Sequence, residues 1–231
     1  EINRPSWRNE KHSAQFISSL KAYAFPKIGE LKVDKIETKD IFSILNPIWL
    51  SKAETASRVR QRLSTVLKYC KAQKWRSDDP ADRDIIQILP KQVRKSNHMK
   101  SMDYNEISTF ILNVKNSDAG AITKLAIEFL ILNASRSGEV RHAKWQELNE
   151  NIWTIPSERM KAGVEHRVPL SERSQKILAE AKKFNLGSEY IFAGYKRDKP
   201  LSENTFNKLA KELGYDVHTH GFRTSFKMWS Q

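Results

Sequence analysis

The sequence predicts a mainly α protein, with an all-helical domain followed by a mostly helical domain that carries a small β-hairpin. The 231 residues suffice for one large or two ordinary domains. Apolar residues recur at helical spacing in most segments, and only residues 152–170 contain two short strand-like runs. A mean hydropathy of −0.63 excludes a membrane protein, and 39% hydrophobic residues exclude wholesale disorder.

The first half of the chain is expected to form three helices, over about residues 7–23, 39–46 and 54–74. Ser6 and Thr38 are suitable N-caps for the first two, and Pro26 and Pro47 are suitable ends. The third helix is the clearest, because its apolar residues follow the i, i+3, i+4, i+7 rule. They form one stripe: Ala56, Val59, Leu63, Val66, Leu67 and Cys70.

The opposite side of this third helix is basic. Residues 51–76 contain eight Lys and Arg and one acidic residue. Such a run is often only a solvated face, but Gln61 and Thr65 among the cations can reach bases or sugars in a groove. The predicted DNA-binding residues are Arg58, Arg60, Gln61 and Lys68 on this helix, Lys11 ahead of it, and Arg94 and Lys95 behind it.

Positive charge is concentrated in the first half. Residues 1–100 hold 21 Lys and Arg against 11 Asp and Glu, whereas residues 101–231 hold 19 against 16. A net charge of +13 favours a polyanionic partner, although solubility alone would also explain it. Residues 89–100 are basic and lack apolar periodicity, which predicts a linker between a domain of residues 1–88 and a domain of residues 101–231.

In the second domain we expect helices near residues 107–114, 119–133, 172–184 and 202–213, and strands near residues 152–156 and 166–170. Asp103 and Glu106 have capping-box spacing ahead of the first helix. The loop of residues 157–165 joins the strands and contains Gly163, so it reads as a long, mobile hairpin tip with Arg159 and Lys161 on it.

Several kinds of site are missing from the sequence. The single cysteine, Cys70, forms neither an internal disulfide nor a thiolate metal cage, and no signal segment is recognisable, so we expect a cytoplasmic protein. Glycine-rich phosphate loops and metal-ligand spacings are also missing, and His218 and His220 are too close in sequence to share a helix face. We therefore predict no metal and no cofactor.

Four cationic groups remain as candidates for chemistry: Arg136, Lys161, His220 and Arg223. Gly138 permits a turn beside Arg136, and Glu139 is placed to orient its guanidinium. Each cation alone has an ordinary structural explanation. Together they indicate stabilisation of a phosphate whose oxygens gain charge in a transition state.

These motifs resemble those of the tyrosine recombinases of the phage and prophage integrase type. The resemblance rests on residues 134–139, on residues 153–171 and on His220-Gly221-Phe222-Arg223, in that order. Residues 7–12 and 54–60 are similar to the core-binding domain of prophage integrases. The resemblance implies the tyrosine recombinase fold and site-specific DNA strand exchange through a 3′-phosphotyrosyl link. It also implies double-stranded attachment-site DNA as partner, a tetramer of the full-length protein, and accessory DNA-bending and directionality proteins.

The resemblance also implies a role for each residue. Arg136 and Arg223 would clamp the non-bridging phosphate oxygens, and Lys161 would protonate the departing 5′-oxygen. His220 would hydrogen-bond the phosphate and help with the tyrosine proton, and Glu139 would hold Arg136.

The sequence departs from the family at the nucleophile. The family's tyrosine follows the His-x-x-Arg motif, whereas the last tyrosine here, Tyr215, precedes it. We therefore expect a chain cut at both ends that binds core-site DNA without cleaving it. A type IB topoisomerase-like enzyme, or a DNA-binding remnant or regulator without catalysis, are the alternatives.

Overall fold

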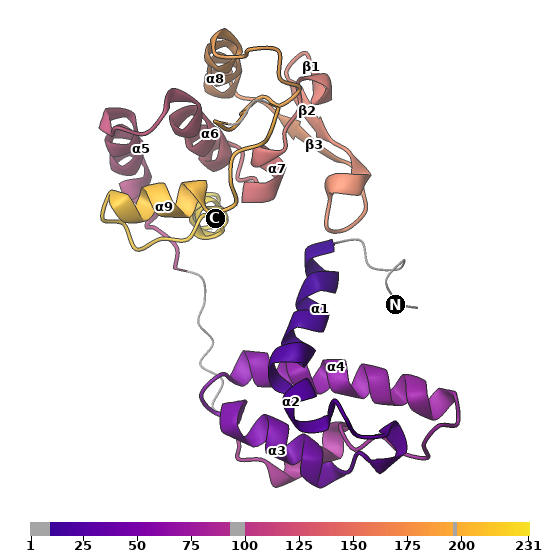
Figure 1. Cartoon of the computed structure of the whole chain (residues 1–231). Helices are drawn as coiled ribbons and strands as arrows, with labels where there is room; N and C mark the ends of the chain where they lie inside the picture. The colour runs from indigo at the N-terminus through magenta and orange to yellow at the C-terminus, as the bar shows by residue number, and fades with distance from the viewer. Residues whose placement is uncertain (1–9, 93–99, 196–197) are drawn as a thin grey trace. The chain divides into compact units, whose positions relative to one another are not determined.

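In a computed structural model, the chain divides into two compact units, residues 1–96 and 97–231 (Figure 1). The structure describes residues 10–92, 100–195 and 198–231. The predicted cap Ser6 and the candidates Arg94 and Lys95 lie outside this set. Lys11 lies in the first turn of the first helix, and its side chain is also outside the described part.

The first unit is helical, as expected. Its helices are α1 (Glu10–Tyr23), α2 (Phe25–Ile28), α3 (Thr38–Trp49) and α4 (Ala53–Ala72), with the 3₁₀ helices η2 (Val33–Lys35) and η3 (Arg83–Ile88). Helices α1 and α3 pack against α4. Pro26 lies in the first turn of α2, where its missing N–H leaves no bond unmade, so it starts a new helix directly after α1.

The prediction that α3 ends at Pro47 is wrong, because the helix continues to Trp49. Proline removes one backbone bond from a helix interior, but here the last turn is held by tertiary packing. Ile48 and Trp49 are buried, and the Trp49 indole N–H donates to the carbonyl of Pro90 at 2.7 Å. Burial of these two side chains therefore outweighs the lost bond.

The apolar stripe of α4 forms as predicted except at one residue. Ala56, Val59, Leu63, Leu67 and Cys70 are buried, whereas Val66 is 41% exposed. The buried face turns instead toward Ser64, whose hydroxyl donates to Asp79 at 2.5 Å. Asp79, in the segment after α4, therefore covers the side of the helix that carries Ser64. Val66 is not on that side and stays exposed.

The predicted linker of residues 89–100 is too long at both ends. Leu89 is buried in the first unit, and the amide nitrogen of Gln92 donates to the carbonyl of Trp49 at 2.8 Å. At the other end, the carbonyl of Lys100 accepts from the backbone of His218 at 3.1 Å. These contacts place residues 89–92 on the first unit and Lys100 on the second.

The second unit combines helices with a three-stranded antiparallel sheet in the order β1-β2-β3. Its helices are α5 (Ile107–Asn116), α6 (Ala121–Leu132), α7 (Ser137–Arg141), α8 (Glu172–Lys183), α9 (Thr205–Glu212) and α10 (Gly221–Trp229), with 3₁₀ helices η4 (Tyr104–Glu106), η5 (Trp145–Glu147) and η6 (Ser157–Arg159). Its strands are β1 (Leu148–Asn149), β2 (Ile152–Ile155) and β3 (His166–Pro169).

The predicted β-hairpin is present, with Ile152 opposite Pro169 and Ile155 opposite His166. Strand β1 and helices α7 and η6 are additions that the sequence pattern did not indicate. The predicted capping box does not form, because Asp103 accepts from the backbone of Asn105 and starts η4 instead. In Figure 1 the hairpin ends in the loop that carries η6.

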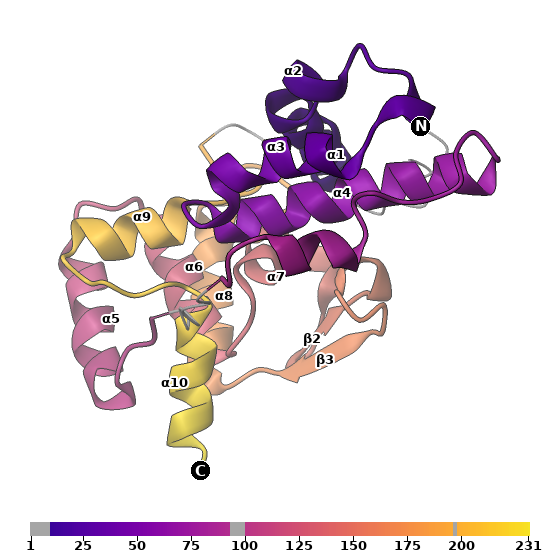
Figure 2. The same ribbon diagram turned by 90° about the horizontal axis from the view of Figure 1, so that it is seen from below.

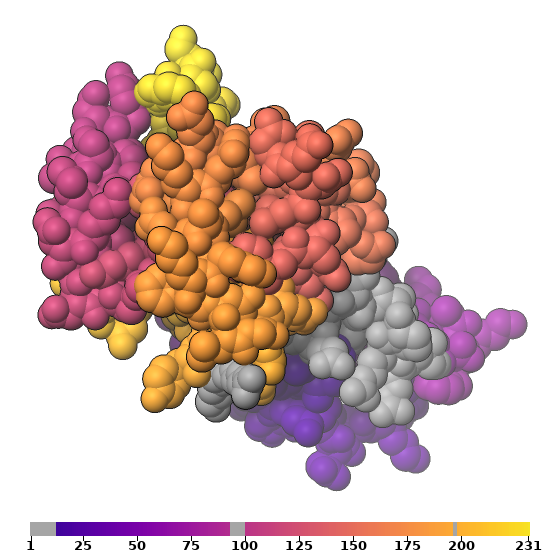
Figure 3. Space-filling view, turned by 90° about the horizontal axis from the view of Figure 1, so that it is seen from above, coloured from indigo at the N-terminus to yellow at the C-terminus, as the bar shows by residue number. Residues whose placement is uncertain are grey.

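The core of the second unit is centred on buried aromatic rings. The ring of Phe129 on α6 lies 5.4 Å from that of Trp153 on β2 and 5.3 Å from that of Phe192. The backbone of residues 189–191 bonds to that of residues 143–145, which joins the later segment to the one before the sheet. In the space-filling view the salmon and orange parts of the second unit lie side by side on one face (Figure 3).

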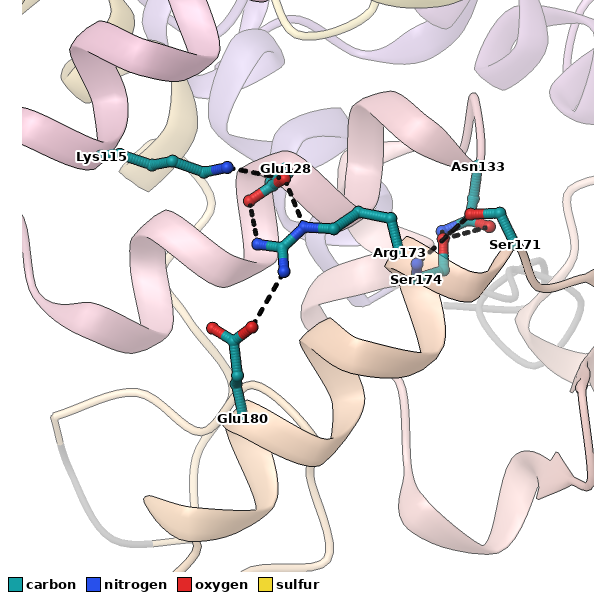
Figure 4. A network of polar contacts seen from close by, with 7 residues as sticks. All are labelled: Lys115, Glu128, Asn133, Ser171, Arg173, Ser174 and Glu180. Carbon is teal, nitrogen blue, oxygen red and sulfur yellow. Dashed lines mark hydrogen bonds and ion pairs between the residues drawn. The ribbon is translucent and has the colours of Figure 1, made fainter.

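A buried carboxylate joins α6 to α8 (Figure 4). Glu128 on α6 accepts two bonds from the guanidinium of Arg173, both at 2.8 Å, and an ion pair from Lys115 at 3.1 Å. Arg173 also donates to Glu180 at 2.9 Å. Burial raises the pKa of the Glu128 carboxyl, but the bonds from Arg173 and Lys115 lower it by more, so the net pKa lies below its ordinary value.

The first residues of the second unit pack directly on the start of α10. A Cβ added to Gly221 would lie 2.3 Å from the carbonyl oxygen of Lys100, so only glycine fits there. Ser225, one turn on, donates to the carbonyl of Met102. The last turn of α10 extends past this cover toward the C-terminus (Figure 2), and Trp229 in that turn is 65% exposed.

Candidate functional site

Arg136 is positioned by the turn that ends α6. Ala134 adopts a left-handed conformation with φ 45°, and the backbone of Ser135 bonds back to Leu130. The chain can then start α7, with Arg136 as its N-cap residue. Gly138, which we expected to permit this turn, lies inside α7, so the turn depends on Ala134 instead.

Glu139 contacts Arg136 twice. Its carboxylate accepts the backbone N–H of Arg136 at 2.8 Å and the guanidinium at 2.5 Å. Glu139 is buried, whereas 41% of the Arg136 side chain is exposed. The carboxylate therefore fixes the base of the side chain, and the rest of the guanidinium can meet a ligand in solvent.

His220 and Arg223 lie at the start of α10, as N-cap residue and in the first turn. The guanidinium of Arg223 donates to the carbonyl of Ala134, which links α10 to the turn that carries Arg136. Phe222, between them in sequence, is buried. Two segments far apart in the chain are thus brought together.

The turn before His220 is held by α9. The side-chain carbonyl of Asn207 accepts from the backbone of Thr219 at 2.9 Å and from its hydroxyl at 2.8 Å. The amide nitrogen of Asn207 lies 3.3 Å from the ring of His218, which in turn accepts the backbone N–H of His220. Sequence reasoning missed Asn207, because an asparagine on a helix carries no signal of a partner 12 residues away.

Arg136, His220 and Arg223 lie close together, because Arg223 on α10 donates to the carbonyl of Ala134, two residues before Arg136, and the charge of Lys161 acts on the same imidazole. Burial lowers the pKa of the His220 imidazole below the ordinary value, and the positive charges of Arg223, Arg136, His218 and Lys161 lower it further. A charge affects a pKa in this way only when it is near. The free site therefore holds a neutral imidazole among cations, an arrangement suited to a polyanionic phosphate.

Lys161 lies in a turn of the β2–β3 loop and is exposed. Among the residues that the structure describes, we find no ion pair or hydrogen bond for its ammonium group. Arg159, expected on the same mobile tip, is instead fixed: it donates to Glu147 and to the backbone carbonyl of Glu139, and 18% of its side chain is exposed. The prediction of a wholly mobile basic tip is wrong at Arg159, because a buried acid holds it.

Glu147 is a second residue that the sequence did not indicate. It is buried, and besides Arg159 it accepts the indole N–H of Trp153 at 2.9 Å. A single acid in a mixed segment is normally solvated, so only the fold identifies this one as an internal acceptor.

The predicted DNA-contacting residues of α4 fall into two groups. Arg58 and Gln61 are exposed, and Arg58 pairs with Glu54 one turn earlier at 2.8 Å. Arg60 is half-buried and donates to the carbonyl of Ala81 at 2.8 Å, and Lys68 pairs with Asp82 at 3.3 Å. Arg60 thus has a structural role in the folded unit, whereas Arg58, Gln61 and Lys68 remain at the surface.

The described part of the chain contains neither a candidate metal site nor a candidate membrane-spanning helix. Within residues 10–92, 100–195 and 198–231, no group of three or more His, Cys, Asp and Glu is arranged to hold a metal ion. No helix in the same ranges combines the length and apolar character needed to cross a bilayer.

Two protein families match this chain, one in each unit. The Phage integrase central domain matches residues 1–84, and the Phage integrase family matches residues 100–229. The putative protein IntB of Escherichia coli K12 is 29% identical, over 94% of this chain and 59% of its own. The integrase of Enterobacteria phage P4 is 28% identical, over 94% of this chain and 53% of its own. The chain thus spans somewhat more than half the length of these relatives.

Solved structures show the same fold. A lambda integrase dimer bound to a COC′ core site superposes with a TM-score of 0.74 at 20% identity, over 94% of this chain and 78% of that one. A lambda integrase tetramer bound to a Holliday junction gives 0.76 at 20% identity, over 97% and 68%. Because the family match covers more than half of the sequence and the fold agrees, the chain belongs to the phage integrase family of tyrosine recombinases.

Proposed function

We propose that this chain is the DNA-binding and phosphate-activating part of a site-specific DNA recombinase, which cuts and rejoins DNA through a 3′-phosphotyrosyl intermediate. The observation that carries the proposal is the convergence of three cations and one histidine from three separate segments. Arg136 follows α6, Lys161 lies on the β2–β3 loop, and His220 and Arg223 start α10. Such a cluster suits a phosphodiester that gains charge during transfer.

Each residue has a task that its environment supports. The two guanidiniums, one held by Glu139 and the other by the carbonyl of Ala134, present planar forks to the non-bridging oxygens. The neutral imidazole of His220 can exchange a proton with the attacking hydroxyl. Lys161, on an exposed turn, is free to reach the leaving 5′-oxygen as general acid.

We assign the predicted domain of residues 1–88, which lies within the first unit, to recognition of the core DNA site. Its excess positive charge and the exposed polar face of α4 support this assignment. Residues 101–231 would form the catalytic domain, and the connection predicted over residues 89–100 would be shorter, because residues 89–92 contact the first unit and Lys100 contacts the second. By analogy with the lambda integrase tetramer on a Holliday junction, four copies of the whole protein would act together. They would do so in the cytoplasm, and accessory DNA-bending and directionality proteins would assist them.

The sequence as printed binds DNA in this proposal but does not cleave it. Its last tyrosine, Tyr215, packs edge-on against Phe110, and its hydroxyl accepts from the side-chain amide of Asn113 at 2.6 Å. A tyrosine engaged in this way serves the core of the unit. Tyr215 is therefore not proposed as the nucleophile.

The test begins by selecting duplexes that the chain retains from a random library and measuring their Kd. Arg136→Ala and Arg223→Ala each remove a charge-assisted contact, so Kd should rise about 10- to 100-fold. Lys183→Ala removes an exposed positive charge on α8 and is the matched control, with little change expected. Equal Kd values for all three variants would overturn the phosphate site. A covalent adduct on a nicked form of the selected duplex would overturn the claim that this chain cannot cleave.

A further inference from the structure

We propose that Arg159 is a positioning residue that fixes the β2–β3 loop so that Lys161 faces the Arg136, His220 and Arg223 cluster. This inference rests on the proposed function for the meaning of the cluster, but the placement itself can be tested on the free protein. It begins from the contrast between two cations two residues apart: Lys161 is exposed, whereas Arg159 is largely enclosed.

The contacts of Arg159 come from two different elements. One guanidinium nitrogen donates to Glu147, which ends η5 just before β1, and the other donates to the carbonyl of Glu139 in α7. A planar fork can hold two acceptors at a fixed angle, whereas a lysine ammonium cannot reproduce that geometry. The loop is therefore tied at η6, immediately ahead of the turn that carries Lys161.

Both acceptors are themselves fixed. Glu147 is buried and accepts the indole N–H of Trp153, a fully buried residue of β2. Glu139 holds Arg136 through its side chain while its backbone carbonyl holds Arg159. One residue therefore contacts both an arginine of the cluster and the anchor of the lysine loop, which sets the position of each relative to the other.

The imidazole of His220 reports where Lys161 lies, because the lysine charge is one of those that lower its pKa. A unit charge about 10 Å away in water changes a pKa by about 0.3. Removal of the charge in Lys161→Ala should raise the His220 pKa by about that amount. Arg159→Ala should raise it similarly, because the untied loop lets Lys161 move away.

The experiment is an NMR titration of the histidines of the whole 231-residue chain without DNA. The decisive variant is Arg159→Ala/Lys161→Ala: when Arg159 acts through Lys161, its substitution causes no additional rise in the His220 pKa once the lysine is absent. If Arg159→Ala raises the His220 pKa by the same amount whether or not Lys161 is present, the Arg159 charge acts directly. That result would overturn the proposal. No rise in Lys161→Ala would overturn it as well.

Three controls keep the outcome specific. Arg167→Ala removes a positive charge from an exposed residue of β3 and should leave the His220 pKa unchanged. The near-UV circular dichroism of Arg159→Ala should match that of the wild type, and loss of this signal would show general loss of structure and refute a positioning role. Arg159→Lys keeps the charge but not the fork, so it should still raise the His220 pKa; a wild-type value in this variant would contradict the need for two contacts.

Failure of these titrations would remove the assignment of Arg159 and leave the proposed recombinase function standing. Failure of the DNA-binding test described above would remove the function and leave the loop placement intact. The two outcomes are therefore distinguishable.

Discussion

Arg173→Met should destabilise the second unit by leaving the carboxylate of Glu128 buried with less support. The wild-type Arg173 guanidinium makes two bonds of 2.8 Å to Glu128 and one of 2.9 Å to Glu180. Methionine is close in length to the aliphatic stem of arginine and lacks the guanidinium, so the packing of the stem is largely kept while the charge is removed. What remains for Glu128 is the ion pair with Lys115.

Breaking a buried ion pair by removing one partner costs about 3–5 kcal/mol. Here 36% of the Arg173 side chain is exposed and Lys115 stays in place, so solvent and the remaining cation reduce the loss. We expect the free energy of unfolding to fall by about 2–3 kcal/mol at pH 7.5. Glu128→Leu/Arg173→Met should recover most of this loss, because no uncompensated charge is then buried.

The pH dependence distinguishes this cause from simple loss of packing. In the wild-type protein the pKa of Glu128 lies below its ordinary value of 4.5, so its stabilising effect is present above pH 4.5 and is lost as the pH falls through the lower folded-state value. In Arg173→Met burial dominates and raises that pKa. Protonation then relieves the penalty, and the destabilisation shrinks between pH 7.5 and pH 5.

Hydrogen exchange of the α6 amides, corrected for intrinsic rates at each pH, measures the effect where Glu128 lies. The expected result is a loss of protection in Arg173→Met that is larger at pH 7.5 than at pH 5. An equal loss at both pH values would refute the role of the buried charge. So would a double variant that is no more stable than Arg173→Met.

Three further predictions concern the site and its surroundings. DNA affinity should rise as the pH falls from 7.5 to 5.5. The pKa of His220 is lowered in the free chain, and a bound phosphate would raise it, so that binding takes up a proton. His220→Asn should flatten this pH dependence in anisotropy titrations. Arg58→Ala and Lys68→Ala should each reduce the slope of log K against log salt by about one, and an unchanged slope would mean that the exposed face of α4 is only solvated. Gly221→Ala should lower the unfolding free energy of the second unit by about 2–3 kcal/mol in urea melts. The control Gly138→Ala, where an added Cβ meets no atom within 4 Å, should cause no loss.

Helical periodicity and strand runs predicted most of the long elements, because their buried faces repeat along the sequence. The stripe of α4 and the pairing of β2 with β3 follow directly from such patterns. The errors arise where a distant contact outweighs a local preference. Pro47 does not end α3, because Trp49 packs against a segment about 40 residues later.

The same distinction applies to the site. The candidate cations could be named from short motifs, but their supports could not. Arg159 and Glu147 are 12 residues apart and meet only because β2 returns the chain to η5. Ala134 takes the left-handed conformation that a pattern reading would assign to Gly138. Local sequence carries no signal for any of these long-range arrangements.

The close fit of Gly221 against Lys100 has a practical consequence for dividing the protein. A recombinant second domain that begins at Asp103 would lack the carbonyl that accepts from His218 and the one that accepts from Ser225. The helix bearing His220 and Arg223 would then lose part of its cover. Expression of an isolated catalytic domain should therefore start ahead of Lys100, so that residues 100–102, which contact the start of α10, are retained.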